Sequence, residues 1–189
     1  DISISVRKRV IRIFRDICLK APSNPKYQQI CSVLLAKMSE PNEQIRKLIA
    51  STFEEMWFAD SSLLQNRVAT KTKGGNARFS EAFRQRVQQI IDCIADCEDE
   101  ETGQRFLIDL LVKMLEKEEK RSKGAQKRSD ADKSRVFAIC EDICCVIVDK
   151  LSKYDFKQTS TKSVKQWDKI KPLINTLYIF SKVRPAFLA

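Results

Sequence analysis

The chain contains 189 residues, and 35 Lys and Arg against 25 Asp and Glu give it a formal net charge of +10. It contains no His, which excludes Ser-His-Asp and Cys-His catalysis and every zinc site built from Cys and His. No run approaches the roughly 20 consecutive apolar residues that a membrane-spanning helix needs. With only four Gly and five Pro, and with long stretches at helical apolar spacing, the composition favours an all-α protein over a β fold.

Three helices are predicted in the first part of the chain, over residues 3–20, 26–39 and 42–58. Each carries an apolar stripe with the 3-4 spacing of a helix that buries one face. Ser3 or Ser5 is placed to cap the start of the first helix. The stripe that we expect the first helix to bury is Val6, Val10, Ile13, Phe14 and Ile17.

The third helix repeats the pattern of the first at an offset of 39 residues. Val6-Arg7-Lys8 aligns with Ile45-Arg46-Lys47, and Asp1 ahead of the first triplet aligns with Glu40. An offset near 40 residues is typical of HEAT and armadillo repeats. We therefore predict an α-solenoid of HEAT repeats, built from antiparallel helix pairs, that occupies residues 1–189 and forms a segment of a larger protein.

Four further helices are predicted over residues 79–97, 102–117, 134–153 and 165–183. Pro172 falls inside the last of them, which predicts a kink there or a helix start near Lys171. The stretch 120–134 is rich in Lys and Arg and low in apolar residues, which is typical of a disordered basic loop. The three stretches that we expect to form mobile loops are 59–77, 120–134 and 154–165.

Seven Cys are present, and most lie in apolar helical stripes, where a free Cys behaves as a small hydrophobic residue. The pairs Cys93/Cys97 and Cys140/Cys144 each face one side of a helix, so together they offer enough ligands for one zinc ion. We favour a core role for both pairs because their stripes are apolar. Lys73-Gly74-Gly75 lacks the frame of a phosphate-binding loop. We therefore expect no cofactor, no metal and no enzymatic activity. Because the cysteines are expected to stay reduced, we also expect a reducing compartment such as the cytosol or nucleus.

Basic side chains remain as candidates for a functional surface, and they concentrate in the first helix. Two roles are open to them. In a structural ladder between repeats, Arg7 and Arg46 bond an acidic residue such as Asp1 of their own or the adjacent repeat. In a DNA-binding surface, stacked repeats present basic residues to phosphates, which makes the affinity strongly salt-dependent, although an acidic protein surface would suit them too. The DNA-binding candidates are Lys8, Arg9, Arg12 and Lys47.

Three stretches of the chain resemble one family. The first is Val6-Arg-Lys-Arg-Val-Ile-Arg-Ile-Phe-Arg-Asp-Ile-Cys18, the second begins Ile45-Arg-Lys-Leu48 and continues with Thr52-Phe53 and Met56-Trp57-Phe58, and the third is Phe180-Ser-Lys-Val-Arg-Pro185. Their order and approximate spacing are similar to the Nipped-B/NIPBL cohesin-loader family, the adherins of sister chromatid cohesion. The first and last stretches are the most specific, and the basic loop fits the family poorly.

The resemblance implies a segment of a large HEAT-repeat, armadillo-like helical protein of the nucleus that loads cohesin onto chromatin in the cell cycle. It implies contacts with the SMC and kleisin subunits of cohesin and with DNA, stimulation of the cohesin ATPase, and a loader partner subunit bound elsewhere in the full chain. The family does not itself hydrolyse nucleotide. The alternative is an unrelated HEAT-repeat scaffold, such as a transport receptor or a phosphatase subunit, that binds only protein.

Overall fold

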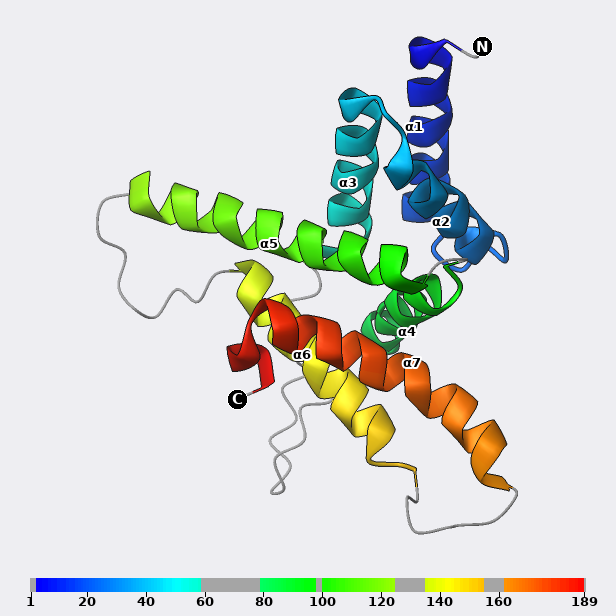
Figure 1. The fold of residues 1–189 in the computed structure, drawn as a ribbon, viewed down its shortest axis with the longest axis vertical. Coiled ribbons are helices and arrows are strands. Elements are labelled where there is room, and N and C mark those ends of the chain that lie inside the picture. Colours follow the sequence, from blue (N-terminus) through cyan, green and yellow to red (C-terminus); the bar gives the residue numbers. More distant parts are fainter. Residues whose placement is uncertain (1–2, 59–78, 98–99, 125–134, 155–161, 189) are drawn as a thin grey trace.

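The computed structural model describes residues 3–58, 79–97, 100–124, 135–154 and 162–188 (Figure 1). Within these ranges the chain forms seven α-helices and no strand, which confirms the predicted all-α, solenoid-like class. The 3-10 turns η1 (Lys37–Ser39) and η3 (Pro185–Leu188) follow the second and the last helix. The helices are α1 (Ile4–Lys20), α2 (Tyr27–Ala36), α3 (Glu43–Phe58), α4 (Glu81–Ala95), α5 (Glu100–Gly124), α6 (Arg135–Leu151) and α7 (Lys162–Val183).

Two helices are longer than the sequence predicted. α5 continues to Gly124, so the predicted loop 120–134 is wrong at its start. Glu and Lys favour helix, so α5 extends beyond the apolar stripe that marked its predicted end. α7 begins at Lys162, ahead of the predicted starts, and passes through Pro172. The predicted loop 59–77, and residues 125–134 and 155–161 of the other two, lie outside the described residues.

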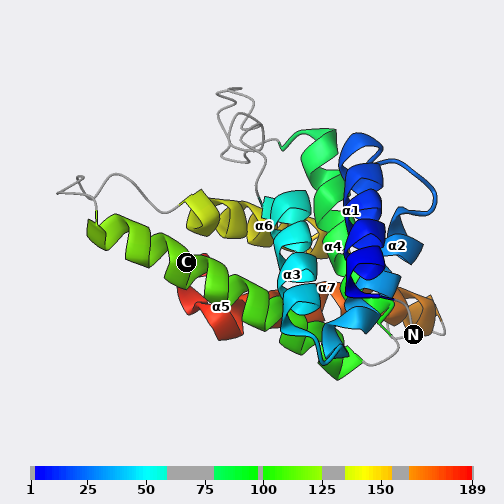
Figure 2. The same ribbon diagram turned by 90° about the horizontal axis from the view of Figure 1, so that it is seen from above.

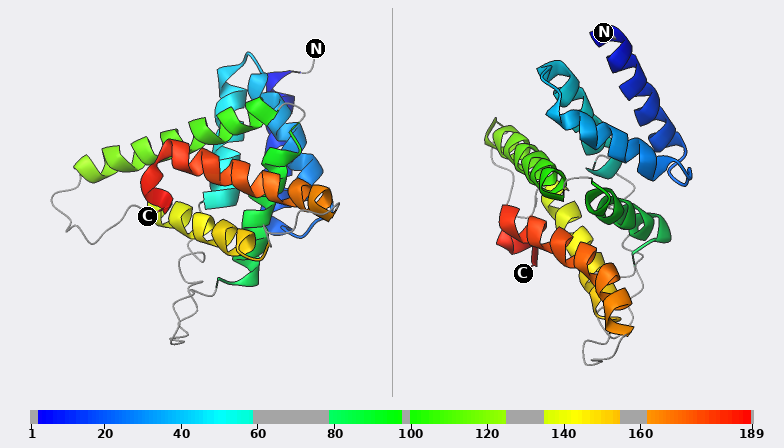
Figure 3. Two further views of the ribbon diagram at one scale, coloured as in Figure 1. Left: turned by 60° about the horizontal axis from the view of Figure 1, so that its bottom comes forward. Right: turned by 45° about the vertical axis from the view of Figure 1, so that its right-hand side comes forward.

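The helices are arranged in two layers. The odd-numbered helices contact one another in the order α1, α3, α5, α7, and the even-numbered helices in the order α2, α4, α6. α1 and α3 lie side by side, and α5 crosses the end of α3 (Figure 1); Figure 2 shows the same succession from above. α7 lies along α5 (Figure 3). Contacts of α4 with α5 and of α6 with α7 join the layers, as in an α-solenoid.

An aromatic cluster joins α3 to α5. Phe53 of α3 is fully buried, and its ring centroid lies 4.5 Å from that of Trp57 and 5.1 Å from that of Phe106 in α5. At the edge of this contact, Lys117 Nζ of α5 lies 2.8 Å from Glu54 Oε1 of α3. The α3–α5 contact therefore combines buried aromatic rings with a solvent-accessible ion pair.

The buried face of α1 differs from the predicted stripe. Val6, Val10 and Ile13 are 50%, 42% and 51% exposed, so their predicted burial is wrong. The reason is that α1, within the described structure, packs against neighbours on one side, whereas α3 lies between α1 and α5. α3 accordingly buries Ile45 and Ile49, which align with Val6 and Val10 in the 39-residue repeat. The residues of α1 that are buried or partly buried against the core are Ile11, Phe14, Ile17 and Cys18.

Polar side chains cap the starts of three helices. Of the two candidate caps of α1, Ser3 is the one that accepts a hydrogen bond from a backbone N–H, that of Val6 at 3.4 Å. Ser80 accepts from the N–H of Phe83 at 3.2 Å, and Asn42 Oδ1 accepts from the N–H of Gln44 at 3.0 Å. These bonds satisfy N–H groups that have no partner inside the helix.

Pro172 lies inside α7 and removes one backbone donor from the helix. The carbonyl of Asp168, four residues earlier, therefore loses its helical N–H partner. One turn later, the buried Thr176 hydroxyl donates to the carbonyl of Pro172 at 2.8 Å. None of the described helices is both long enough and apolar enough to cross a membrane.

The cysteine pairs lie in the core. Cys93, Cys140 and Cys144 are buried, and Cys97 is half-buried. None of the seven cysteines forms a disulfide. The described residues contain no group of three or more His, Cys, Asp or Glu that could hold a metal ion. The burial of the two pairs agrees with the core role that their apolar neighbours indicated.

The Arg84–Asp149 ion pair connects α4 to α6, with Arg84 Nη1 at 2.9 Å from Asp149 Oδ2. The hydrogen bond from Arg84, followed by that from Lys153, lowers the pKa of Asp149 below its usual value of 3.8. A carboxyl whose pKa is lowered by folding stabilises the fold above its unfolded pKa, and this stabilisation is lost as the pH falls through the folded pKa.

We expect Arg84→Gln to lower the free energy of unfolding by about 1 kcal/mol at pH 7, because the pair is partly exposed. The difference from the wild type should shrink as the pH falls below 3.8 and through the lower pKa of folded Asp149, because the carboxyl then becomes protonated in both proteins. Urea denaturation over a descending pH series measures this. A difference that stays constant while Asp149 becomes protonated would show that the loss comes from the aliphatic part of Arg84 rather than from its charge.

Candidate nucleic-acid interface

α1 and α3 place three of the four DNA-binding candidates on one outer face. Lys8 Nζ donates to Gln44 Oε1 of α3 at 2.5 Å, so its ammonium lies between the two helices. Arg12 lies one turn further along α1 on the same side, and Lys47 lies three residues from Gln44 along α3. Arg12 and Lys47 are both exposed, so this face presents cations to solvent.

Arg9 belongs to a different sector of α1. Successive helix residues are rotated by about 100°, which turns Arg9 away from Lys8 and toward the side of Val6 and Ile13. Arg9 is exposed there, beside exposed apolar side chains. The four candidates therefore do not converge on one point, and the basic surface of α1 bends around the helix from Lys8 through Arg12 to Arg9.

Acidic neighbours neutralise part of this surface. Lys47 Nζ lies 2.8 Å from Glu43 Oε1, and the hydrogen bond from Lys47 lowers the pKa of Glu43. Arg15 pairs with Asp16 at 2.9 Å and approaches Glu55 of α3 at 3.7 Å. In contrast, Arg9 and Arg12 form no ion pair with any other described residue. These two are therefore the cations of the surface that are best placed to contact a phosphate.

Arg7 and Arg46 lie on the inner side of the same two helices and bond to the turn between α2 and α3. The Arg7 guanidinium pairs with the Glu40 carboxylate, which comes from the adjacent repeat. The Arg46 guanidinium donates to the backbone carbonyls of Glu40 and, at 2.7 Å, Pro41. Asp1, the third residue of the predicted ladder, lies outside the described residues.

A second group of cations lies on α5, where the sequence had predicted a functional role for Lys120 alone, as part of a basic loop. Together with Glu116, these cations line a shallow hollow of about 430 Å³. The signal that could have found them was their i, i+4, i+7 spacing, but the end of α5 was placed too early and Lys120 was assigned to a loop. These cations are Lys113, Lys117 and Lys120.

The chain was compared with family models and with known proteins. No family model matches it. It is 30% identical over 190 residues to the Nipped-B-like protein of Homo sapiens, 29% identical over 195 residues to the Nipped-B protein of Drosophila melanogaster, and 27% identical over 190 residues to the Nipped-B-like protein scc-2 of Caenorhabditis elegans. Each alignment covers 100% of this chain.

The same alignments cover a small part of each relative. The chain spans about 6% of the human protein and about 8% of the fly and worm proteins. The similarity runs from one end of the chain to the other and is not confined to the three stretches that carry the resemblance. The chain is therefore a segment that belongs to the Nipped-B family.

Proposed function

We propose that this chain is a helical scaffold segment of a cohesin loader, acts in the nucleus, and carries out no catalytic step of its own. The observation that carries the proposal is the end-to-end similarity to the Nipped-B relatives. The two-layer architecture supports a binding role, because its extended helix faces present side chains to partners. The partners of this segment would be cohesin, through its SMC and kleisin subunits, and DNA, while the loader's partner subunit would bind elsewhere.

The outer surface of α1 is the region that we propose for DNA. Arg9 and Arg12 offer exposed guanidinium groups without acidic partners among the described residues. The Lys8 ammonium donates a hydrogen bond to the neutral side chain of Gln44, and Lys47 is paired with the carboxylate of Glu43. Contacts of this kind recognise phosphate rather than base sequence. We therefore propose that the surface adds a few sequence-independent phosphate contacts to cohesin loading and thereby supports DNA-dependent stimulation of the cohesin ATPase.

The test is the double variant Arg9→Glu/Arg12→Glu in the full-length protein. We expect its affinity for a 30-base-pair duplex to fall about 10-fold or more at low salt, because two phosphate contacts are lost and two repulsions are gained. The slope of log K against log salt should become shallower by about 2. Fluorescence anisotropy over a KCl series measures both quantities, and an ATPase assay with cohesin measures the effect on stimulation.

The matched control is Lys26→Glu/Lys37→Glu, which makes the same change in net charge at the two ends of α2. Both control residues are exposed, and they lie in the other layer of helices. The proposal requires the control to bind DNA almost as the wild type does. If both variants weaken binding equally, net charge rather than the α1 surface is responsible, and if neither does, α1 is no DNA site.

The contact with cohesin is tested separately, by cross-linking the full-length protein to cohesin and DNA and mapping the linked peptides by mass spectrometry. We expect links from exposed lysines of this segment to an SMC or kleisin subunit. Links that lead only to proteins unrelated to cohesin would favour the alternative of a scaffold of another class.

A further inference from the structure

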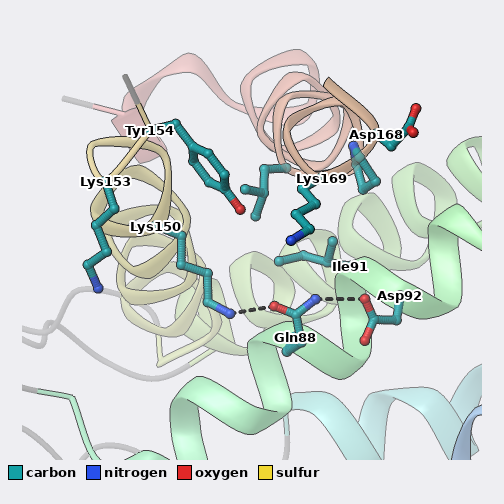
Figure 4. A pocket seen from close by; sticks show the side chains of 10 residues that line it. Gln88, Ile91, Asp92, Lys150, Lys153, Tyr154, Asp168 and Lys169 are labelled. Atoms are coloured by element: carbon teal, nitrogen blue, oxygen red, sulfur yellow. Dashed lines mark hydrogen bonds between the residues drawn. The ribbon is translucent and has the colours of Figure 1, made fainter. Parts of the chain in front are cut away.

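A cavity of about 480 Å³ lies where α4, α6 and α7 converge, on a different part of the molecule from the α1 surface. In Figure 4 the ammonium groups of Lys150 and Lys169 point into it from α6 and α7, and the Tyr154 hydroxyl points into it from the turn that follows α6. Ile91 lies on its floor, and Lys153 extends away from it (Figure 4). The cavity therefore combines hydrogen-bond donors from two helices with an apolar base.

Lys150 is a half-buried cation whose hydrogen-bond acceptor is neutral. Its Nζ donates to Gln88 Oε1, and Gln88 Nε2 in turn donates to Asp92 Oδ1 at 2.6 Å. Burial lowers the pKa of Lys150; the carboxylates of Asp92 and Glu81 oppose this shift, and the cations Arg84 and Lys153 add to it. The charge of Lys150 is thus poorly compensated, and an anionic group in the cavity would compensate it.

Lys169, on the α7 side of the cavity, is a second cation without an anionic partner among the described residues. It is exposed at the mouth of the cavity, and it forms no ion pair with another described residue. Lys153, by contrast, already pairs with Asp149 at 3.3 Å. The donors that face the cavity without an anionic acceptor are therefore the two ammonium groups of Lys150 and Lys169.

We propose that this cavity binds the anionic side chain of a peptide segment from a partner protein, a Glu, an Asp or a phosphorylated Ser. The anion accepts hydrogen bonds from Lys150, Lys169 and the Tyr154 hydroxyl, and the neighbouring peptide residues pack on Pro172 and the buried Leu173. Charge-assisted hydrogen bonds of this kind are stronger than those between neutral groups. This site is separate from the proposed DNA surface, and neither proposal depends on the other.

The acidic residues of the cavity favour a peptide over nucleic acid. Asp92 and Asp168 line the same cavity as the lysines. A phosphate backbone carries closely spaced charges, so a strand long enough to reach both lysines would also bring phosphates close to these carboxylates. A peptide brings one anionic group and neutral neighbours, and therefore avoids this repulsion.

The test is lysine-acylation footprinting of the full-length protein, read by peptide mass spectrometry. The probes are the N-acetyl, N-methylamide derivatives of glutamate, phosphoserine and glutamine, at equal ionic strength. We expect glutamate or phosphoserine to reduce acylation of Lys150 and Lys169 at least threefold, and glutamine to have no effect. Lys113 and Lys117 of α5 are the internal controls, and their acylation should not change.

Two variants test the geometry. Lys169→Met, at an exposed position, should abolish the protection of Lys150, whereas Lys113→Met should leave it intact. Equal protection by glutamine, or equal protection of the α5 lysines, would overturn the proposal. Protection of Lys150 and Lys169 by a 30-base-pair duplex, without protection by the amino-acid probes, would overturn the choice of a peptide. None of these outcomes depends on Arg9 or Arg12, so they are separate from the test of the DNA surface.

Discussion

Replacing Phe53 by Ala is expected to lower the free energy of unfolding by about 3–5 kcal/mol. Phe53 has no exposed surface, so its removal takes a whole aromatic side chain out of the core and leaves a cavity. The ring also contacts Trp57 and Phe106, and each such aromatic pair adds about 0.5–1.5 kcal/mol to the effect of burial. Because Phe106 belongs to α5, the substitution weakens the contact between α3 and α5 as well as α3 itself.

Urea denaturation followed by circular dichroism measures this loss. The matched control is Tyr178→Ala on α7, which removes an aromatic side chain that is 55% exposed. The control should cost less than about 1 kcal/mol. If Phe53→Ala cost no more than Tyr178→Ala, the aromatic cluster would not stabilise the α3–α5 contact. Separate unfolding transitions of the first three helices and of the other four would indicate that this contact carries their cooperativity.

Reversing the charge of Arg7 should have the second largest effect, a loss of about 2–3 kcal/mol in the free energy of unfolding. The Glu40 carboxylate that pairs with Arg7 is 15% exposed and Arg7 is 33% exposed, so the pair is partly shielded from water. A surface pair contributes at most about 1 kcal/mol and a broken buried pair costs about 3–5 kcal/mol, which places this one between them. Arg7→Glu brings two carboxylates together at the turn between α2 and α3.

The double variant Arg7→Glu/Glu40→Arg provides the control, because it restores opposite charges with their positions exchanged. It should recover part of the loss, and a double-mutant cycle gives the interaction energy of the pair. Full recovery is not expected, since Arg46 also bonds the backbone of Glu40 and Pro41. If the double variant were less stable than Arg7→Glu alone, the ion pair would not be what ties the two repeats together.

The helix pattern was predictable because it depends on local sequence. The spacing of apolar residues located the seven described helices. The alignment of Val6-Arg7-Lys8 with Ile45-Arg46-Lys47 identified α1 and α3 as equivalent helices of two adjacent repeats, and these two helices lie in contact. Exposure of a given stripe depends on the neighbours of its helix, which spacing does not encode. For this reason Ile45 is buried while Val6, at the same place in its repeat, is exposed.

The candidate site was predictable only in part, because the partner of each cation is set by the packing of helices distant in sequence. The sequence placed Lys8, Arg9, Arg12 and Lys47 on α1 and α3, but not the bond from Lys8 to Gln44. The cavity between α4, α6 and α7 was not predictable, since Lys150 and Lys169 lie in separate helices and meet through tertiary packing.

The distribution of the cysteines favours labelling of the molecule at one position over the others. A maleimide reacts with the thiolate, and burial disfavours that form. Burial raises the pKa of Cys144 to about 12 and raises that of Cys140 well above its usual value. A hydrogen bond with Cys31 and burial raise the pKa of Cys18. The hydrogen bond with Cys18 lowers the pKa of Cys31, but a hydrogen bond with Cys93 and burial outweigh it and raise that pKa overall. Cys145, on the exposed side of α6, is the thiol that a reagent reaches first. A fluorophore there would mark the even-numbered layer for distance measurements to α1 without any engineered cysteine.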